Sequence, residues 1–377
     1  MPTLREVTAV LESWYPPSYA DSWDRVGLVC GDPQAEVRRI LLAVDPVVAV
    51  AREAVEWGAD LVIVHHPLYL KGTSSVAADS PKGRVVHDLL SNGCGLYAAH
   101  TNADAPAEGV SESIAQALGL MDSAPLDADP VQAVDKIVVF VPRRDADVVR
   151  EAMTAAGAGA IGDYDSCTFT ATGEGRFRPL QGADPTIGEV GSLEVVDEVR
   201  IETVVQRGLR GQVLAAMLAA HPYEEPAYDV LELAALDDPT RGSGRIGRLE
   251  EPVTLREFAE QVAHVLPHTA HGVRVCGDPH KRIETVALCG GAGDFLLDRA
   301  RVKGADVYLT SDLRHHPASE LREHAALGDD LALVDVAHWA AEWMWLPTLS
   351  RKLDGAWGDR VETRVSTINT DPWTFRV

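Results

Sequence analysis

Residues 58–67 are Gly-Ala-Asp-Leu-Val-Ile-Val-His-His-Pro, a stretch that predicts a strand ending in two histidines. The four apolar residues 61–64 are typical of a parallel strand buried on both faces. Pro67 has no amide hydrogen for a ladder, so the strand must end at His65 and His66. Ligands of open α/β sheets bind beyond the carboxyl ends of the strands, which makes the two imidazoles candidate ligands. A hydrogen-bonded His-His turn is the alternative.

Predicted strands and helices alternate on both sides of this stretch. We expect strands over residues 37–44 and 96–99 and helices over residues 47–57 and 82–91, from the spacing of their apolar residues. Strands that alternate with helices are the signature of a parallel sheet with right-handed crossover connections. The amino-terminal part of the chain is therefore expected to be an α/β unit.

The carboxyl-terminal part of the chain repeats this plan. A helix, Gly-Ala-Asp and the start of a strand follow one another over residues 52–60 and again over residues 298–306. In that register the two histidines correspond to Ser311-Asp312. The repeated order indicates a duplicated α/β half, although only two copies are present.

The next strand of each half supports the duplication. One ends in Ala-His-x-x-x-Asp, with His100 and Asp104, and the other in Ala-His-x-x-x-Glu, with His338 and Glu342. We therefore predict an α/β fold in which two related halves form one metal-binding unit. The ends of their strands are expected to converge on a common site.

The composition changes between the two halves. Residues 121–134 are rich in Asp, Ala and Pro, and we interpret them as a linker. A β-α-β unit, a long hairpin and a second α-β unit follow and are typical of a small ferredoxin-like α+β module. The expected domains are residues 1–130, an inserted domain over residues 131–236, and residues 237–377.

Two conspicuous stretches receive plainer interpretations. Residues 242–247 match Gly-x-Gly-x-x-Gly, but no helix opens directly on these glycines, so a turn is expected rather than a dinucleotide site. Residues 221–226, His-Pro-Tyr-Glu-Glu-Pro, form a polar loop of the inserted module that either contacts a substrate or is a solvated turn.

The bulk composition narrows the class of protein. The chain has 377 residues, 46% of them hydrophobic, and a net charge of −23, which argues against non-specific binding to nucleic acid or acidic membranes. Its five cysteines form no Cys-x-x-Cys pair, a pattern that favours reduced thiols. No amino-terminal apolar signal or membrane-spanning run is visible. We expect a cytoplasmic protein without membrane or nucleic-acid partners.

The strand ends supply a set of nitrogen and oxygen ligands suited to Zn, Fe or Mn. The set consists of His65, His66, His100, Asp104, His338 and Glu342, with Asp312 as a further candidate. His338 and Glu342 are spaced i and i+4, so they lie on one face of a helix start. A pair of metal ions needs a bridging oxygen ligand, and Glu342 is the candidate bridge.

Three of these assignments have alternatives. For His100, a role in orienting another metal ligand is at least as well supported as direct binding of the metal. Asp104 could instead form an Asx turn near Pro106. A second His-His-Pro, residues 315–317, comes three residues beyond its strand end and is expected to begin a helix.

Five motifs together resemble one known family, the NIF-three-like proteins, also called GTP cyclohydrolase I type 2 homologues or dinuclear-metal-centre hexameric proteins. They are Ser22-Trp23-Asp24-x-x-Gly27-Leu28, His65-His66-Pro67, His100-Thr101-Asn102-x-Asp104-Ala105, Thr310-x-Asp312 and His338-x-x-x-Glu342. The inserted module resembles the PII/CutA-like module of the longer bacterial members. The residues on which this second resemblance rests are 136–142, 187–191 and 221–225.

The resemblance implies a site and an activity. It implies two divalent metal ions, Zn, Fe or Mn, held by His65, His66, Asp104, His338 and Glu342, with the glutamate touching both, in a toroidal homohexamer. It implies a metal-dependent hydrolase of a nucleotide or related heterocycle, with His100 as a candidate proton shuttle. The absence of a Gly-x-x-x-x-Gly-Lys loop weakens specificity for GTP. The alternative is a non-catalytic metal-binding, metal-delivery or regulatory protein with a ligand-sensing PII-like module.

Overall fold

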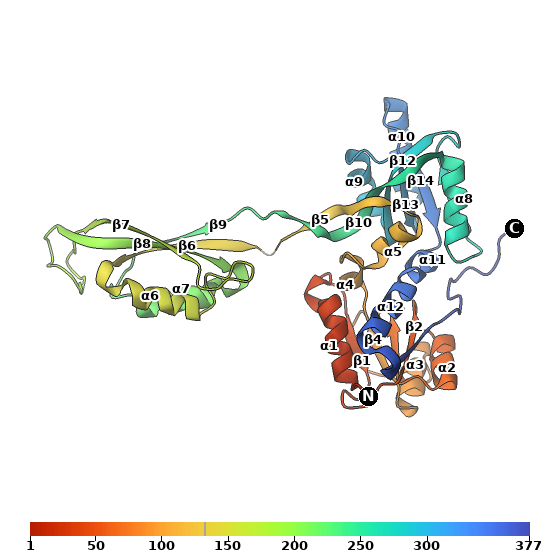
Figure 1. Cartoon of the computed structure of the whole chain (residues 1–377), viewed down its shortest axis with the longest axis horizontal. Helices are drawn as coiled ribbons and strands as arrows, with labels where there is room; N and C mark the ends of the chain where they lie inside the picture. Colours follow the sequence, from red (N-terminus) through yellow and green to blue (C-terminus); the bar gives the residue numbers. More distant parts are fainter. Residues whose placement is uncertain (132) are drawn as a thin grey trace. The chain divides into compact units, whose positions relative to one another are not determined.

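Two compact units make up the chain in the computed structural model, which describes residues 1–131 and 133–377 (Figure 1). Unit 1 consists of Met1–Asp129 and Pro239–Val377, and unit 2 of Pro130–Asp238. Residue 132, within the expected linker, lies outside the described residues. Across the described residues, no helix is both long and apolar enough to cross a membrane.

The first sheet of unit 1 is built around the strand that precedes His65. Its order is β1-β4-β3-β2-β15. The strands are β1 (Gly27–Cys30), β2 (Arg39–Ala43), β3 (Leu61–Val64), β4 (Gly95–Ala98) and β15 (Glu362–Val365). β2, β3 and β4 pair in parallel, and β1 runs antiparallel to β4. All four residues of β3 are buried, which confirms the expected strand with two covered faces.

The second sheet of unit 1 repeats this arrangement. Its order is β11-β14-β13-β12-β10-β5. The strands are β5 (Met121–Pro130), β10 (Asp237–Thr254), β11 (Arg274–Cys276), β12 (Arg282–Ala292), β13 (Val307–Ser311) and β14 (Ala332–Val336). β12, β13 and β14 pair in parallel, and their order matches that of β2, β3 and β4 in the first sheet.

Helices cover the sheets of unit 1 and separate them. They are α1 (Leu4–Trp14), α2 (Val48–Trp57), α3 (Pro81–Ser91), α4 (Thr101–Asp104), α5 (Val110–Ala117), α8 (Leu255–Val265), α9 (Leu297–Val302), α10 (His315–His324), α11 (His338–Trp343) and α12 (Trp345–Trp357). Figure 1 shows α11 and α12 between the two sheets, where their apolar side chains join strands of both sheets in one core. Separate cores with α2 and α3, and with α9, cover the other faces.

The two Gly-Ala-Asp sequences form the same turn. Gly58 and Gly304 have φ angles of 72° and 73°, a left-handed conformation that glycine adopts without a steric penalty. Asp60 accepts two backbone N–H bonds at the start of β2, at 2.7 and 2.9 Å. Asp306 accepts two at the start of β12, at 2.9 and 2.8 Å. The repeat in the sequence therefore corresponds to a repeat in local structure.

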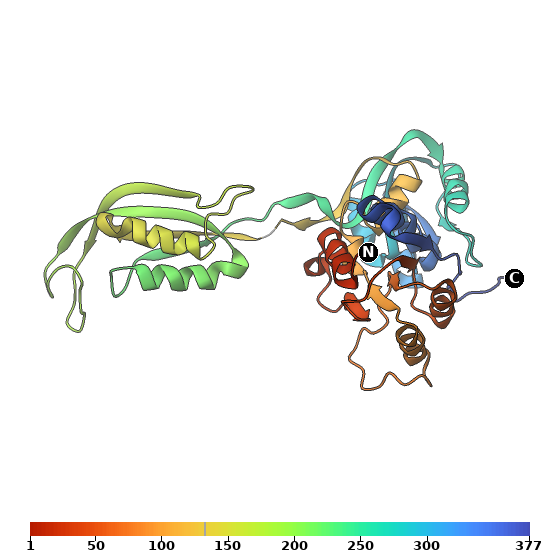
Figure 2. The same cartoon turned by 60° about the horizontal axis from the view of Figure 1, so that its bottom comes forward.

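Unit 2 is a four-stranded antiparallel sheet with two helices over one face (Figure 2). Along the chain its elements are β6 (Val134–Pro142), α6 (Ala146–Ala155), β7 (Thr168–Phe177), β8 (Glu194–Gln206), α7 (Arg210–Ala220) and β9 (Tyr228–Glu232). The strand order is β7-β8-β6-β9. Apolar residues of α6, α7, β6 and β8 form its core.

Two expectations about irregular segments were wrong. Most of the expected linker is strand β5, which joins the second sheet beside β10. The glycines of residues 242–247 lie within β10 rather than in a turn. A Cβ atom at Gly242 would lie 2.2 Å from the carbonyl oxygen of Asp127 in β5, so these glycines permit close contact between the two strands.

Candidate metal centre

The candidate ligands come together within unit 1, at the ends of three strands. His65 and His66 follow β3, and His100 follows β4. Both His338 and Glu342 belong to α11, which begins directly after β14. The carboxyl ends of the parallel strands in both sheets therefore point toward one site, as the sequence predicted.

Glu342 lies at the centre of the cluster. Its Oε1 atom is 2.7 Å from Nε2 of His338 and 3.4 Å from Nε2 of His65. Its Oε2 atom is 3.0 Å from Nε2 of His66. Burial raises the pKa of the Glu342 carboxyl group, but the three imidazoles outweigh burial and hold the pKa well below its usual range. Glu342 is thus a buried carboxylate that faces both halves of unit 1.

Each histidine is oriented by an acceptor behind its ring. Nδ1 of His66 donates to Asp45 at 2.7 Å, and Nδ1 of His338 donates to Asp312 at 2.8 Å. Nδ1 of His100 donates to Asp24, and Nδ1 of His65 donates to the carbonyl oxygen of Ala99, both at 2.9 Å. These bonds fix the Nδ1–H tautomer and direct every Nε2 atom toward the cluster. A histidine that binds a metal commonly has such a partner on its other nitrogen.

Two of the orienting aspartates were missed by sequence reasoning. Asp45 follows the expected strand over residues 37–44 and received no role, and Asp24 was only part of a motif that carried the resemblance. Asp24 is buried and also accepts bonds from the backbone and hydroxyl of Thr101 at 3.1 and 2.6 Å. Burial raises the pKa of Asp24, but the bonds from His100 and Thr101 lower it below its usual range. Asp312, considered as a ligand, instead contacts His338.

The charges of the cluster favour protonated imidazoles. Burial lowers the pKa of His66, but the carboxylates of Glu342 and Asp45 raise it to about 11. Burial likewise lowers the pKa of His338, whereas Glu342 and Asp312 raise it to about 10. A metal ion that replaces these protons would satisfy the same carboxylates.

The remaining candidates, Asp104 and His100, lie beside this core. Oδ1 of Asp104 is 3.7 Å from Nε2 of His65, and burial raises the pKa of the Asp104 carboxyl group. At the start of α4, the side chain of Asn102 accepts a hydrogen bond from the backbone N–H of His100. Ligand atoms of His65, His66 and His100 lie within 4.8 Å of one another, as do those of His66, His338 and Glu342.

Two orphaned atoms show that these residues fit a divalent ion. Nε2 of His65 and Oε2 of Glu342 are buried, and their contacts with Glu342 at 3.4 Å and with His66 at 3.0 Å lack hydrogen-bond geometry. Buried polar atoms without partners are costly, and a bound cation would satisfy both. The set of imidazole nitrogens and carboxylate oxygens suits Zn, Fe or Mn. The site could therefore bind metal, and the geometry identifies His66 and Glu342 as its best-placed groups.

The cluster opens into a cavity of about 500 Å³ in unit 1. Tyr19, Trp23 and Phe295 supply aromatic surface, and among the described lining residues none is a lysine or an arginine. Gly291 borders the cluster at a φ of 71°, where an added Cβ atom would lie 2.6 Å from Oε1 of Glu342. The signal that could have located this wall is the Gly-Gly-Ala-Gly sequence after Cys289.

The second His-His-Pro does not join the cluster. His315 and His316 begin α10, which confirms the expected helix start. Among the described residues, the groups that could hold a metal include neither of them.

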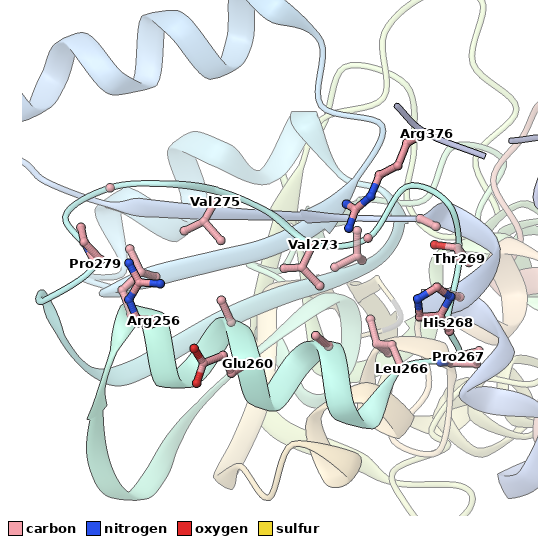
Figure 3. Close-up of a pocket in the computed structure, with 18 residues that line it drawn as sticks. Arg256, Glu260, Leu266, Pro267, His268, Thr269, Val273, Val275, Pro279 and Arg376 are labelled. Atoms are coloured by element: carbon pink, nitrogen blue, oxygen red, sulfur yellow. The ribbon is translucent and has the colours of Figure 1, made fainter. Parts of the chain in front are cut away.

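A slightly larger cavity of about 520 Å³ lies elsewhere in unit 1, between α8 and the segment around β11 (Figure 3). Figure 3 shows its polar groups, Arg256, Glu260, His268 and Arg376, spread around an apolar floor. They do not form a cluster that could bind a metal. The candidate chemistry therefore lies at the smaller cavity beside Glu342.

Comparison with known proteins gives one consistent result. The family model described as Duf34/NIF3 (NGG1p interacting factor 3) matches residues 2–372. A Mycobacterium tuberculosis protein named GTP cyclohydrolase 1 type 2 homolog is 49% identical over 377 residues, covering 99% of this chain and 97% of the relative.

Solved structures agree with this match. The crystal structure of a Bacillus cereus protein related to NIF3 is 38% identical, with a TM-score of 0.68, and covers 100% of this chain and 99% of its own. The crystal structure of a Staphylococcus aureus protein is 27% identical, with a TM-score of 0.80 and the same coverage. The chain therefore belongs to the Duf34/NIF3 family.

Proposed function

We propose that this protein is a metal-dependent hydrolase with two divalent ions, acting on a nucleotide or a related heterocycle. The observation that carries the proposal is the position of Glu342. Its two oxygens face different histidines, with His338 and His65 nearest to one oxygen and His66 nearest to the other. A carboxylate in this position is suited to bridge two ions, with His65, His66, Asp104 and His338 as the other ligands.

The proposed chemistry divides between the ions and the chain. When bound, two divalent ions lower the pKa of a coordinated water and so supply a nucleophile at neutral pH. His100 is the candidate to accept and return a proton, because Asp24 fixes its Nδ1–H and directs its Nε2 atom toward the cluster. The enclosing wall around Gly291 and the aromatic residues would exclude bulk water from a bound ring.

The cavity lining favours a ring over a polyphosphate as the recognised group. Trp23 and Phe295 offer flat apolar surfaces, whereas the described lining contains no lysine or arginine to bind phosphates. Relatives bear the name GTP cyclohydrolase 1 type 2 homolog. We propose that the heterocycle binds in this cavity and that the phosphates of a nucleotide add little affinity.

Two features of the assembly are also proposed. The β-α-β-β-α-β order and the antiparallel sheet of unit 2 support a ferredoxin-like module of the PII/CutA type. By resemblance to its family, the chain is proposed to form a toroidal homohexamer in the cytoplasm. Sedimentation velocity of the purified protein would measure the number of chains directly.

The test of the proposed activity is turnover by protein with a defined metal. Metal-free protein is reconstituted with Zn, Fe(II) or Mn and incubated with a panel of nucleobases, nucleosides and nucleotides, and mass spectrometry detects hydrolysed products. Activity should disappear in Glu342→Ala and His65→Ala and persist in Glu320→Ala, which alters an exposed residue of α10. Turnover that persists in Glu342→Ala would contradict the proposal. Rapid metal exchange without turnover would favour metal delivery or regulation instead.

A further inference from the structure

Unit 2 contains a cavity of about 440 Å³ that plays no part in the proposed hydrolysis. The stretch His221–Pro226, expected to be a substrate-contacting or solvated loop, forms part of its wall through Tyr223, Glu224 and Glu225. Phe140 and Phe177 add two further aromatic rings, and Phe177 packs against Tyr223 with ring centroids 5.5 Å apart. The cavity therefore combines aromatic surface with polar groups of the stretch.

A buried carboxylate from β8 lines this cavity. Glu198 is 9% exposed, and its Oε1 atom accepts a hydrogen bond from the hydroxyl group of Tyr223 at 2.8 Å. Among the residues that the structure describes, no lysine, arginine or histidine nitrogen forms an ion pair with Glu198. The arginines of the lining, Arg176 and Arg178, are exposed, and Arg176 pairs with Glu174 at 2.6 Å. A buried carboxylate without a cation is unfavourable unless a ligand supplies one.

The neighbouring strand is shaped to receive this carboxylate. Gly175 of β7 lies beside the Glu198 side chain, and a Cβ atom at Gly175 would lie 2.2 Å from Oε2 of Glu198. Glycine within a strand commonly marks such a close approach. Burial raises the pKa of Tyr223, and the adjacent Glu198 raises it further, so the hydroxyl group of Tyr223 remains a hydrogen-bond donor. Both contacts hold the carboxylate in place at the cavity.

Hydrogen bonds also connect the cavity walls. The hydroxyl of Thr186, in the β7–β8 loop, donates to the carbonyl oxygen of Pro222 at 2.6 Å. The backbone N–H of Asp184, in the same loop, donates to Glu224 at 3.0 Å. His221 donates from Nε2 to Phe140 at 2.9 Å. The loop and the His221–Pro226 stretch are thereby joined around the carboxylate.

We propose that this cavity binds a small organic cation, a primary amine or guanidinium group on a short carbon chain. The charged group would donate hydrogen bonds to Glu198, a charge-assisted interaction, and the carbon chain would lie against Phe177 and Tyr223. Phosphate-bearing ligands are disfavoured by the buried negative charge. This site is separate in sequence and in unit from the candidate metal centre.

Equilibrium dialysis of the full metal-loaded chain tests this proposal, with labelled putrescine as the probe. Saturable binding of one putrescine per chain is expected, with displacement by agmatine but not by the uncharged diol of the same carbon chain. Equal displacement by the diol, or the absence of saturable binding at millimolar concentration, would overturn the proposal. This comparison uses the unaltered protein and needs no variant.

Variants locate the site. Glu198→Gln keeps the shape and the bond from Tyr223 but removes the charge, so affinity should fall at least about tenfold. Asp197→Asn is the matched control, because it removes an equal charge from an exposed neighbour that pairs with Arg143. Circular dichroism and metal content check folding. Unchanged affinity in Glu198→Gln, or an equal loss in Asp197→Asn, would contradict the assignment.

Discussion

The two halves of unit 1 have the same backbone plan but contribute different side chains to the site. In both, a glycine in the left-handed region is followed by an aspartate that caps the start of an adjacent strand. After the next strand, the first half places His65-His66 and the second places Ser311-Asp312. The first half therefore supplies imidazoles at this position, whereas the second supplies a carboxylate that orients His338.

The shared backbone plan determines the fold, whereas the differing side chains determine the chemistry of the site. Identical turns and matching sheet orders bring the strand ends of both halves to one place. The site then depends on residues that are not equivalent, with Glu342 of the second half facing His65 and His66 of the first. Substitutions at equivalent positions should consequently have equal effects on folding and unequal effects on metal binding.

The largest effect is expected for Glu342→Gln. It removes the charge shared by three imidazoles, and metal affinity should fall by more than about a hundredfold, beyond the loss usual for residues that only orient a ligand. Elemental analysis after dialysis against a chelator measures this loss. Glu362→Gln, an exposed change in β15, serves as the control. Full metal content in Glu342→Gln would show that the halves do not share an ion.

The pH dependence tests whether both halves bind the metal. In metal-free protein His66 has a pKa of about 11 and His338 about 10, so each carries a proton at neutral pH. Metal must displace both protons, so affinity should rise about a hundredfold per pH unit up to about pH 10, rise less steeply above it, and level off only above about pH 11. Competition with a chelator at several pH values measures the slope. A slope of tenfold per pH unit would indicate that metal binding releases a proton from one half only.

Gly291→Ala tests the wall between the halves. The new Cβ atom would lie 2.6 Å from Oε1 of Glu342, so the carboxylate must move and affinity should fall about tenfold or more. Gly304→Ala is the control for backbone strain, because it has a similar φ of 73° but no atom within 4 Å of the added Cβ. Isothermal titration with Zn compares the two variants. Equal losses in both would assign the effect to strain alone.

The orienting aspartates of the two halves should differ in importance. The Asp45 side chain is 24% exposed and the Asp312 side chain 59%, so solvent weakens the second contact more. Asp45→Asn should lower metal affinity by about tenfold to a hundredfold, and Asp312→Asn by about tenfold at most. The same titration measures both. A larger loss in Asp312→Asn would reverse the proposed ranking of the halves.

The smallest effect on metal content is expected for the two capping aspartates. Asp60→Ala and Asp306→Ala each remove the acceptor of two backbone N–H groups, and each should lower the free energy of unfolding of unit 1 by about 1–3 kcal/mol. All eight tryptophans lie in unit 1, so their fluorescence in a urea titration follows that unit. Asp197→Ala, in unit 2, should not move the transition. Clearly unequal losses would contradict the structural equivalence of the turns.

The sequence was sufficient to predict where the strands end, because local residue patterns determine these positions. The buried apolar run of residues 61–64 and the helix start at His315 follow from local pattern, and both are present. The linker prediction failed because residues 121–130, although rich in Asp and Pro, pair with the distant strand β10. Local composition does not report such pairing.

The sequence predicted the candidate site to the same extent as it predicted the fold. Residues at strand ends could be listed, because the topology brings these ends together. Asp45 and Asp24 could not be assigned, since each contacts a histidine 21 or 76 residues away. The role of Glu198 in unit 2 was also hidden, because its partner Tyr223 is 25 residues away and its cavity needs a glycine on another strand.

The most direct test of the account is anomalous X-ray diffraction from crystals of the Zn-loaded protein. Two anomalous peaks per chain are predicted, both within bonding distance of Glu342 and with histidines of both halves among their neighbours. A single peak held by one half alone, or peaks remote from Glu342, would contradict the claim that the two halves share a pair of ions.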